Sequence, residues 1–326
     1  MTATQLRTTQ LRETGLEITR LGVGAWAIGG GGREHGWGPQ DDEESIAAIH
    51  RALERAINWI DIAAAYGFGR SEQIVGRALE GVAERPYVFT KCSLLEGPDR
   101  TVVHSLKRDS ILRDAGDSLR RLGVDAIDTY QIHWPILEED IEQGWAALAE
   151  LKDAGLVRHI GVSNFNVEQL RRIQRIAPVE TLQPQYSLIE RDAQCEILPL
   201  AEREGVGVIA YSPMGAGMLT GKMTRARIDQ LPEDDWRKHD ARFNEPPMSR
   251  NLDLVDRLAS VADRYDTSPG AVAVAVAVAV AWTLRNPAVD GAIVGFRHPD
   301  QVDPILTAAG FELTDEDLAE IEGGIR

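Results

Sequence analysis

Apolar and polar positions along this chain of 326 residues follow two alternating patterns. Short runs rich in β-branched residues, typical of buried strands, cover residues 21–27, 59–63, 87–91, 126–133, 157–162, 180–184, 206–211 and 291–295. Longer segments with apolar residues at helical spacing cover residues 43–57, 71–82, 105–122, 141–154, 167–176, 192–203 and 252–265. This alternation predicts a parallel α/β fold. Eight strands favour a (β/α)8 TIM barrel formed by a single domain over residues 1–326.

Three further segments are expected to decorate this barrel. Residues 11–18 predict a short β-hairpin before the first strand, in a position to plug the barrel floor. The long segments 28–42 and 214–251 come after the first and seventh predicted strands, and such loops form the carboxyl face where barrel active sites lie. Within the second loop, the charged run 232–242 is expected to be a solvated surface.

Residues 271–282 form an alternating alanine–valine tract that ends in Trp282. Alternation with a period of two normally indicates a strand, but both residue types are apolar, so no polar face is present. Ser268 and Pro269 form a favourable helix start, and Asn286 and Pro287 form a stop. The tract is therefore predicted to be a buried helix.

Composition and charge exclude several classes of protein. Hydrophobic residues make up 43% of the chain and charged residues 26%, which is typical of a globular domain. The formal net charge of −16 disfavours binding to nucleic acid or to an anionic membrane, although a single site can still be locally basic. The longest apolar run is too short for a membrane span, and the amino-terminal segment lacks the apolar stretch of a signal peptide. With only two cysteines at unrelated positions, we expect a cytoplasmic protein.

Four polar residues lie at or just beyond the ends of predicted strands: Asp61, Tyr66, Lys91 and His133. Strand ends in a barrel face one mouth, so these side chains should converge. A tyrosine hydroxyl, with a pKa of about 10, is a poor acid at neutral pH unless a positive charge stabilises its phenolate. Lys91 can supply that charge, Asp61 can hold Lys91, and His133 can orient a substrate oxygen. Each residue alone is more simply a cap or surface group, so it is their combination that indicates proton transfer to a carbonyl.

Seven motifs, in order along residues 21 to about 321, resemble those of the aldo-keto reductase superfamily. They are IDIAAAYG with the adjacent SE (60–67, 71–72), FTK (89–91), YQIHW (130–134), GVSNF (161–165), LQPQYSLIER (182–191), YSPMGAGMLTGK (211–222) and AIVGFRHPDQ (292–301). The glycine-rich loop 28–42 most resembles the bacterial branch that contains stress-induced reductases and polyol or glycerol dehydrogenases. The resemblance implies a barrel enzyme that transfers a hydride between a nicotinamide cofactor and a carbonyl compound or alcohol.

The resemblance also implies roles for the four polar residues. Tyr66 would be the general acid in reduction and the base in oxidation, tuned by Lys91, which pairs with Asp61. His133 would position and polarise the carbonyl group. No metal ion is expected at this site.

A cofactor cradle is implied in the same way. The glycine-rich turn after Tyr211 would offer backbone amides to the pyrophosphate, and Tyr211 would stack on the nicotinamide ring. The residues expected to contact the cofactor are Trp26, Ser163, Asn164, Gln183, Tyr211, Ser212, Met214, Gly215, Gly217, Gly295, Arg297 and Gln301.

Arg297 favours NADP, because a planar guanidinium can bind a 2′-phosphate through two hydrogen bonds, although NAD is possible. Two positions depart from the family pattern. Ile305 stands where the family often has an asparagine for the adenine, which puts adenine recognition in doubt, and Ile62 stands where it usually has threonine.

Small aldehydes, ketones or polyols are the expected substrates, because aromatic residues are predicted to line the barrel mouth. The residues expected to contact the substrate are Trp26, Trp37 and Trp134, and Trp37 is equally a candidate loop anchor. We expect a monomer or a weak homo-oligomer.

Two other functions remain open. A protein of this fold can bind a nicotinamide cofactor as a regulatory or redox-sensing subunit with little turnover, and the presence of all four polar residues argues against that. Lys91 could instead form a Schiff base, as in a class I aldolase, and borohydride would then trap it. The cofactor motifs favour the reductase.

The alanine–valine tract generates a first prediction. It is about six residues longer than the corresponding segment of the proteins it resembles, which is not a whole number of helical turns of 3.6 residues. The extension should rotate or bulge the segment after it, so a variant lacking three Ala-Val units should melt at a higher temperature or bind NADP more tightly. Equal melting points in thermal denaturation and equal affinities in a cofactor titration would contradict this prediction.

Overall fold

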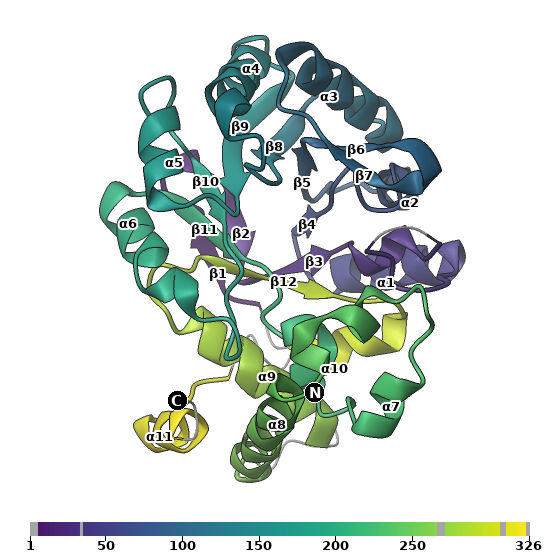
Figure 1. Ribbon diagram of the computed structural model, residues 1–326, viewed down its shortest axis with the longest axis vertical. Helices are drawn as coiled ribbons and strands as arrows, with labels where there is room; N and C mark the ends of the chain where they lie inside the picture. The colour runs from purple at the N-terminus through teal and green to yellow at the C-terminus, as the bar shows by residue number, and fades with distance from the viewer. Residues whose placement is uncertain (1–5, 33–34, 266–270, 307–310, 324–326) are drawn as a thin grey trace.

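A closed ring of parallel strands forms the centre of the molecule, and helices surround it (Figure 1). The computed structural model describes residues 6–32, 35–265, 271–306 and 311–323. The strands have the order β10–β11–β12–β3–β4–β5–β8–β9 around the barrel. They are β3 (Leu21–Gly24), β4 (Trp59–Asp61), β5 (Tyr87–Cys92), β8 (Ile127–Ile132), β9 (Val157–Ser163), β10 (Thr181–Gln183), β11 (Gly207–Ala210) and β12 (Gly291–Gly295). The predicted (β/α)8 barrel and its eight strands are confirmed.

Eight of the helices that the structure describes correspond to predicted segments, with local shifts, and three others lie outside those segments. The helices are α1 (Asp42–Glu54), α2 (Arg70–Leu79), α3 (Arg108–Leu122), α4 (Ile141–Asp153), α5 (Val167–Ile173), α6 (Ile197–Glu204), α7 (Arg225–Asp229), α8 (Pro247–Asp263), α9 (Ala271–Leu284), α10 (Val302–Leu306) and α11 (Asp315–Glu322). Both α7 and the start of α8 lie inside the segment 214–251 that was expected to be a loop. In the part of the chain that the structure describes, no helix is long and apolar enough to cross a membrane.

Local sequence signals explain where several helices begin and end. Asp41 caps α1 by accepting a hydrogen bond from the backbone of Glu44, and Asn166 forms a capping box with Gln169 at the start of α5. Gly123 ends α3 with a φ of 65°, a left-handed conformation that favours glycine. The caps of α1 and α5 fix strand-to-helix connections at the carboxyl end of the barrel.

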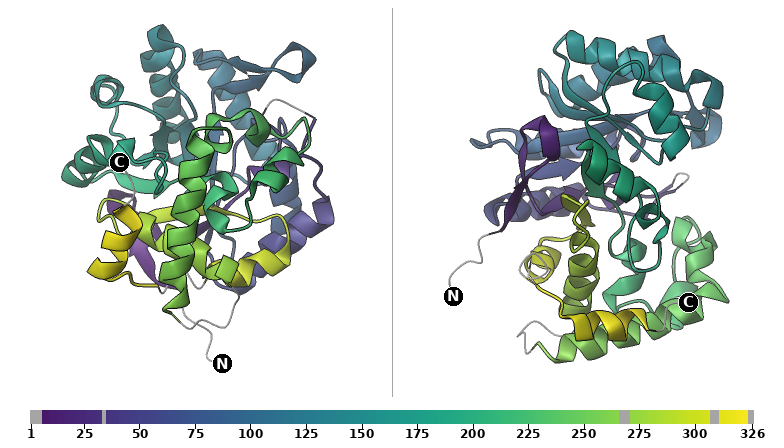
Figure 2. Two further views of the ribbon diagram at one scale, coloured as in Figure 1. Left: turned by 60° about the horizontal axis from the view of Figure 1, so that its bottom comes forward. Right: turned by 90° about the vertical axis from the view of Figure 1, so that its left-hand side faces the viewer.

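The amino-terminal hairpin closes the opposite end of the barrel (Figure 2, right). Its strands, β1 (Thr8–Gln10) and β2 (Glu17–Thr19), pair antiparallel on either side of a short 3-10 turn. Leu11, Leu16 and Ile18 are buried in one cluster with barrel residues that include Trp59. The Trp59 indole donates a hydrogen bond to the carbonyl of Thr19, at 2.8 Å. The predicted hairpin plug is therefore confirmed.

The alanine–valine tract is helical, as predicted, because it forms most of α9. Its predicted start at Ser268 and Pro269 lies outside the described residues. Side chains from Val276 to Trp282 are buried in the core. The next strand, β12, pairs with β3 from Ala292 opposite Leu21 to Gly295 opposite Gly24, so the barrel closes after the tract. The predicted cost of the extension in stability or cofactor affinity is untested.

A second hairpin, which the sequence did not predict, comes after β5. It consists of β6 (Leu94–Glu96) and β7 (Val102–His104), joined through a 3-10 turn that contains Pro98. Apolar residues on both sides of a Gly-Pro-Asp turn are the sequence signal for such a hairpin. The hairpin lies at the carboxyl end of the barrel and contributes to its mouth.

A buried polar cluster lies between the barrel and helices α2 and α3. Glu72 is fully buried and accepts hydrogen bonds from Thr90 Oγ1 at 2.7 Å and from Arg121 Nε at 2.6 Å. Asp114 is also buried, and its Oδ2 atom has no hydrogen-bond partner among the described residues. Burial first, and then the charge of Glu72, raise the pKa of Asp114 to about 7.

This shift predicts that Asp114 makes stability depend on pH. Its pKa is about 7 in the folded protein and about 3.9 in an unfolded chain, so the folded state binds this proton more tightly. The resulting stabilisation is complete below about pH 4 and is lost as the pH rises through 7. Asp114→Asn, which mimics the protonated form, should therefore be more stable than wild type at pH 8, by about 4 kcal/mol, and similar to it at pH 4.

Melting temperatures measured between pH 4 and 8 test this prediction. Asp109→Asn, on the exposed face of the same helix, is the control and should match the wild-type curve. A difference between Asp114→Asn and wild type that does not grow with pH would contradict the assignment.

Candidate active site

The four predicted polar residues converge at the carboxyl end of three neighbouring strands. Asp61 ends β4, Lys91 lies in β5, and His133 directly follows β8. Tyr66 lies in the loop after β4. Its ring packs edge-on against the His133 ring, with centroids 5.7 Å apart. The convergence that was predicted from strand ends is therefore present in the structure.

Lys91 is the centre of this group. Its side chain is fully buried, and Nζ donates hydrogen bonds to Asp61 Oδ1 at 2.7 Å, to the carbonyl of Ile62 at 2.8 Å and to the Tyr66 hydroxyl at 3.4 Å. Because Ile62 contributes its backbone, the departure from threonine at this position leaves the contact in place. The Ile62 side chain itself packs in the core.

Burial shifts the pKa of each titratable group in the site. It raises the pKa of Tyr66 well above its usual value, with smaller contributions from the charges of Asp61 and Tyr211. It also lowers the pKa of His133 well below its usual value, with help from the Lys91 charge. The expected stabilisation of a Tyr66 phenolate by Lys91 is outweighed by burial, so Tyr66 and His133 are both neutral near pH 7.

A hydrogen-bonded chain of amides supports Asp61 from the barrel interior. Gln183 Nε2 donates to Asp61 Oδ2 at 2.7 Å and to Gln131 Oε1 at 3.0 Å. Gln131 Nε2 in turn donates to Thr181 Oγ1 at 3.1 Å. Both hydrogens of the Gln183 amide are used in this way, which leaves its Oε1 as an acceptor. Sequence reasoning missed Gln131, although it lies two residues before His133 in the YQIHW motif.

Ser163 and Asn164, which were expected to contact the cofactor, form a second network. Ser163 Oγ donates to the Gln183 carbonyl at 2.8 Å, and Asn164 Nδ2 donates to the His133 carbonyl at 3.0 Å. The Tyr211 hydroxyl donates to Asn164 Oδ1 at 2.9 Å. Asn164 has a φ of 63° and Ser212 a φ of 55°, left-handed conformations that cost energy in residues other than glycine. Such strained residues often occur at functional sites.

Two cavities meet at these residues. The large cavity, of about 640 Å³, extends from Asp61 and Tyr66 to Arg297. The small cavity, of about 490 Å³, contains His133 and extends to the β6–β7 hairpin. Both cavities are lined by Trp26, Tyr66, Tyr211 and Ser212.

Most of the predicted cofactor residues line one of these cavities. Those on the large cavity include Met214, Gly217, Gly295, Arg297 and Gln301, together with Ile305. Those on the small cavity include Ser163, Asn164 and Gln183. Gly215 does not line either cavity; it packs against Ile189, because an added Cβ would lie 2.6 Å from Ile189 Cδ1.

Three tryptophans join the two long loops over the cavities. Trp26 stacks on Trp236 with ring centroids 5.0 Å apart, and Trp37 meets Trp26 and Trp236 edge-on at 5.2 and 5.7 Å. The Trp236 amide also donates to the carbonyl of Gly36, at 3.3 Å. Trp37 lines only the large cavity, in agreement with the loop-anchor interpretation. Trp134 lines the small cavity and is 39% exposed.

The prediction that the charged run 232–242 is a solvated surface was wrong for its central part. Asp235 is 1% exposed and accepts two hydrogen bonds from the Arg237 side chain, at 2.9 and 2.6 Å. Arg237 lies over the Trp37 ring and lines the large cavity, whereas Arg242 lies over the Trp236 ring and lines the small one. Charges that pair locally and stack on aromatic rings can be buried in this way.

Comparisons with known proteins agree with this geometry. A model described as the Aldo/keto reductase family matches residues 20–325. Relatives in sequence include aldo-keto reductase YhdN from Bacillus subtilis (strain 168), 38% identical over 96% of this chain and 92% of that protein. Another is the NADH-specific methylglyoxal reductase from Escherichia coli (strain K12), 33% identical over 94% of each chain. A similar solved structure is the glycerol dehydrogenase AKR11B4 from Gluconobacter oxydans, with a TM-score of 0.84 and 36% identity over 100% of this chain and 96% of that one.

The chain belongs to the aldo/keto reductase family, as its motifs predicted. It is accordingly an oxidoreductase of the kind that uses a nicotinamide cofactor and acts on carbonyl compounds or alcohols.

The large cavity fits such a cofactor by the chemistry of its lining. Lys222, Arg227, Arg237 and Arg297 line it, which makes the cavity locally basic within an acidic protein. Trp37 also lines this cavity, and its buried indole nitrogen has no hydrogen-bond partner among the described residues. These cations suit a dinucleotide with its phosphates in the large cavity.

Proposed function

We propose that the protein is an NADP(H)-dependent reductase of small aldehydes or ketones, which oxidises alcohols or polyols in the reverse direction. Tyr66 would be its general acid and base. The observation that carries this proposal is that Tyr66, with the Lys91–Asp61 pair behind it, lies where the two cavities meet. A cofactor in the large cavity and a substrate in the small one would both reach Tyr66.

Each group at the site would have a distinct role in the proposed reaction. When bound, the cofactor supplies a hydride in reduction and accepts one in oxidation. As negative charge develops on the carbonyl oxygen, the neutral Tyr66 hydroxyl would donate its proton to that oxygen. Lys91, 3.4 Å from the hydroxyl, would stabilise the phenolate that remains. His133, neutral because of its lowered pKa, would donate an N–H to the same oxygen and so orient it.

Arg297 supports NADP(H) as the preferred cofactor, because its guanidinium lines the large cavity and could bind a 2′-phosphate there. One relative is named as NADH-specific, so NAD(H) is the alternative for this chain. Relatives named for methylglyoxal and glycerol suggest small, oxygen-rich substrates. Trp26 and Trp134 would provide the apolar wall of the substrate site.

We further propose a single catalytic domain that acts in the cytoplasm as a monomer or weak homo-oligomer. The two cysteines do not form a disulfide, which agrees with a reducing compartment. A regulatory protein that binds the cofactor without turnover is the second candidate. It would bind NADPH but leave its absorbance unchanged in the presence of aldehydes.

Tyr66→Phe tests the proposed acid. Removing the hydroxyl should lower kcat for reduction of a panel of aldehydes by roughly 10²- to 10⁴-fold, because general acids contribute about that much. The affinity for NADPH, measured by fluorescence titration, should change little. The assay records the loss of NADPH absorbance.

Tyr87→Phe is the matched control, since Tyr87 begins β5 near the barrel floor, and it should retain wild-type turnover. Undiminished turnover in Tyr66→Phe would refute the role of Tyr66. Wild-type binding of NADPH without turnover of any aldehyde or alcohol would instead favour the regulatory function.

A further inference from the structure

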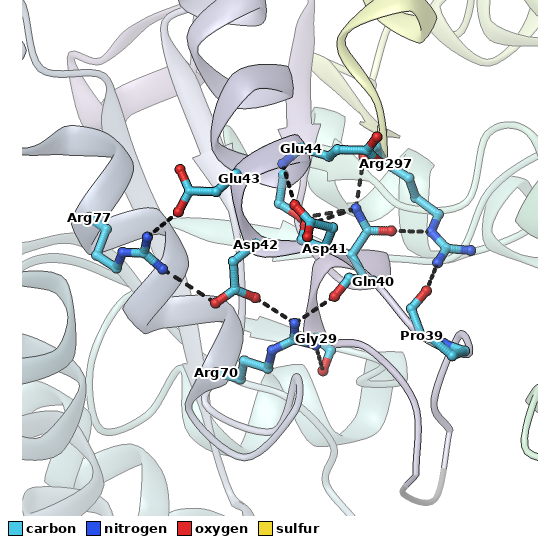
Figure 3. Close-up of polar contacts among 11 residues, drawn as sticks. Gly29, Pro39, Gln40, Asp41, Asp42, Glu43, Glu44, Arg70, Arg77 and Arg297 are labelled. Atoms are coloured by element: carbon cyan, nitrogen blue, oxygen red, sulfur yellow. Dashed lines mark hydrogen bonds and ion pairs between the residues drawn. The ribbon is translucent and has the colours of Figure 1, made fainter.

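The loop between β3 and α1 grips Arg297 through two consecutive residues (Figure 3). Arg297 Nε donates to the side-chain oxygen of Gln40 at 2.6 Å, and Arg297 Nη2 donates to the Pro39 carbonyl. In return, Gln40 Nε2 donates to the Arg297 carbonyl at 2.8 Å. One glutamine amide thus holds both the main chain and the side chain of Arg297.

Gln40 is itself fixed by its surroundings. Its Nε2 also donates to Ser45 Oγ, at 3.0 Å, and Ser45 is fully buried. The Gln40 carbonyl accepts a hydrogen bond from Arg70 Nη2 at 2.7 Å, and Arg70 forms an ion pair with Asp42. Gln40 is therefore a rigid support, since both its main chain and its side chain are bound to helices α1 and α2.

The other side of Arg297 is fixed as well. Gln301 Oε1 accepts hydrogen bonds from the backbone amides of Arg297, at 2.7 Å, and His298, at 3.2 Å. His298 pairs with Glu44 of α1. The turn that carries Arg297 is thus held from both sides.

These contacts decide which edge of the guanidinium is available. An arginine has five N–H donors in a planar fork, and two of them are used by Gln40 and Pro39. The remaining donors belong to Nη1 and Nη2, and Arg297 lines the large cavity. We call the edge formed by Nη1 and Nη2 the outer edge of the guanidinium. It stays available when Nε is held by Gln40, and it can bind a phosphate through two parallel hydrogen bonds.

We propose that Gln40 is a positioning residue that determines cofactor selectivity, because it holds Arg297 with its outer edge toward the 2′-phosphate of NADPH. This inference rests on the proposed use of NADP(H). NADH lacks that phosphate and gains nothing from an aligned guanidinium. Gln40 therefore contributes to the affinity for NADPH and not to that for NADH.

Dissociation constants for NADPH and NADH, measured by calorimetry or by quenching of tryptophan fluorescence, test the proposal without any turnover. Gln40→Ala should weaken NADPH binding about tenfold, as expected for a misaligned charged hydrogen bond, and change NADH binding less than about twofold. Gln40→Glu should weaken NADPH further, because the new carboxylate would pair with Arg297 and repel the phosphate. Gln73→Ala, an exposed glutamine on α2, is the control and should match wild type.

A double-mutant cycle separates positioning from a general effect on the loop. Arg297→Ala should abolish the preference for NADPH, and adding Gln40→Ala to it should cause no further loss. The rise in melting temperature that saturating NADPH produces should shrink in the same variants, while the rise produced by NADH should not. Melting curves without ligand confirm that each variant is folded.

Different results would overturn different statements. If Gln40→Ala weakens NADPH and NADH equally, or changes neither, Gln40 does not determine selectivity, even where Arg297→Ala abolishes the preference for NADPH. If wild type does not prefer NADPH and Arg297→Ala has no effect, the proposed cofactor is wrong, and this inference falls with it.

Discussion

The candidate active site depends on one buried ion pair, between Lys91 and Asp61. Three atoms of β4 and the loop after it accept the hydrogen bonds of the ammonium group, which pins Tyr66 to β5. Gln183 donates a hydrogen bond to the second carboxylate oxygen of Asp61, so neither charge is left without partners. Removing one member of such a pair would leave an uncompensated buried charge, at a cost of about 3–5 kcal/mol. The pair can exist because β4 and β5 are adjacent parallel strands, with Asp61 opposite Phe89 and Lys91 two residues further along β5, where side chains point to the same face as Phe89.

The loop between β3 and α1 connects the two functional ends of the large cavity. Trp37 anchors it to Trp236 near Tyr66, and Gln40, three positions further on, anchors it to Arg297. A substitution at either anchor would therefore also alter the position of the other anchor. The cavity that this loop closes is basic, although the whole chain has a formal charge of −16. An acidic surface repels anions at long range, but salt screens this repulsion. The cations of the cavity can still bind phosphates, because they interact most strongly with the groups that lie beside them.

The sequence predicted the features that depend on strand order and missed those that depend on contacts between loops. Asp61, Lys91 and His133 could be placed because strand ends in a barrel share one mouth. Arg237 could not, because a charged run normally indicates a solvated surface, and only the fold brings Trp37 beneath it. Gln40 and Arg297 are far apart in the chain, so no local pattern links them. The direction of the Tyr66 pKa was missed for a similar reason, since burial cannot be read from residue spacing and here outweighs the nearby lysine.

The ionisation of the site fits the chemistry that we propose. Lys91 and Asp61 neutralise each other, and burial keeps Tyr66 and His133 uncharged, so the junction of the two cavities has little net charge before reaction. A neutral carbonyl compound can enter such a site without displacing a counter-ion. As its oxygen becomes negative, the Tyr66 hydroxyl and a His133 N–H would already be available as donors, with the Lys91 ammonium next to the Tyr66 oxygen. Donors that are in place before the charge appears need no reorganisation during the reaction. They stabilise the transition state more than the neutral substrate, and only such a difference lowers the activation barrier.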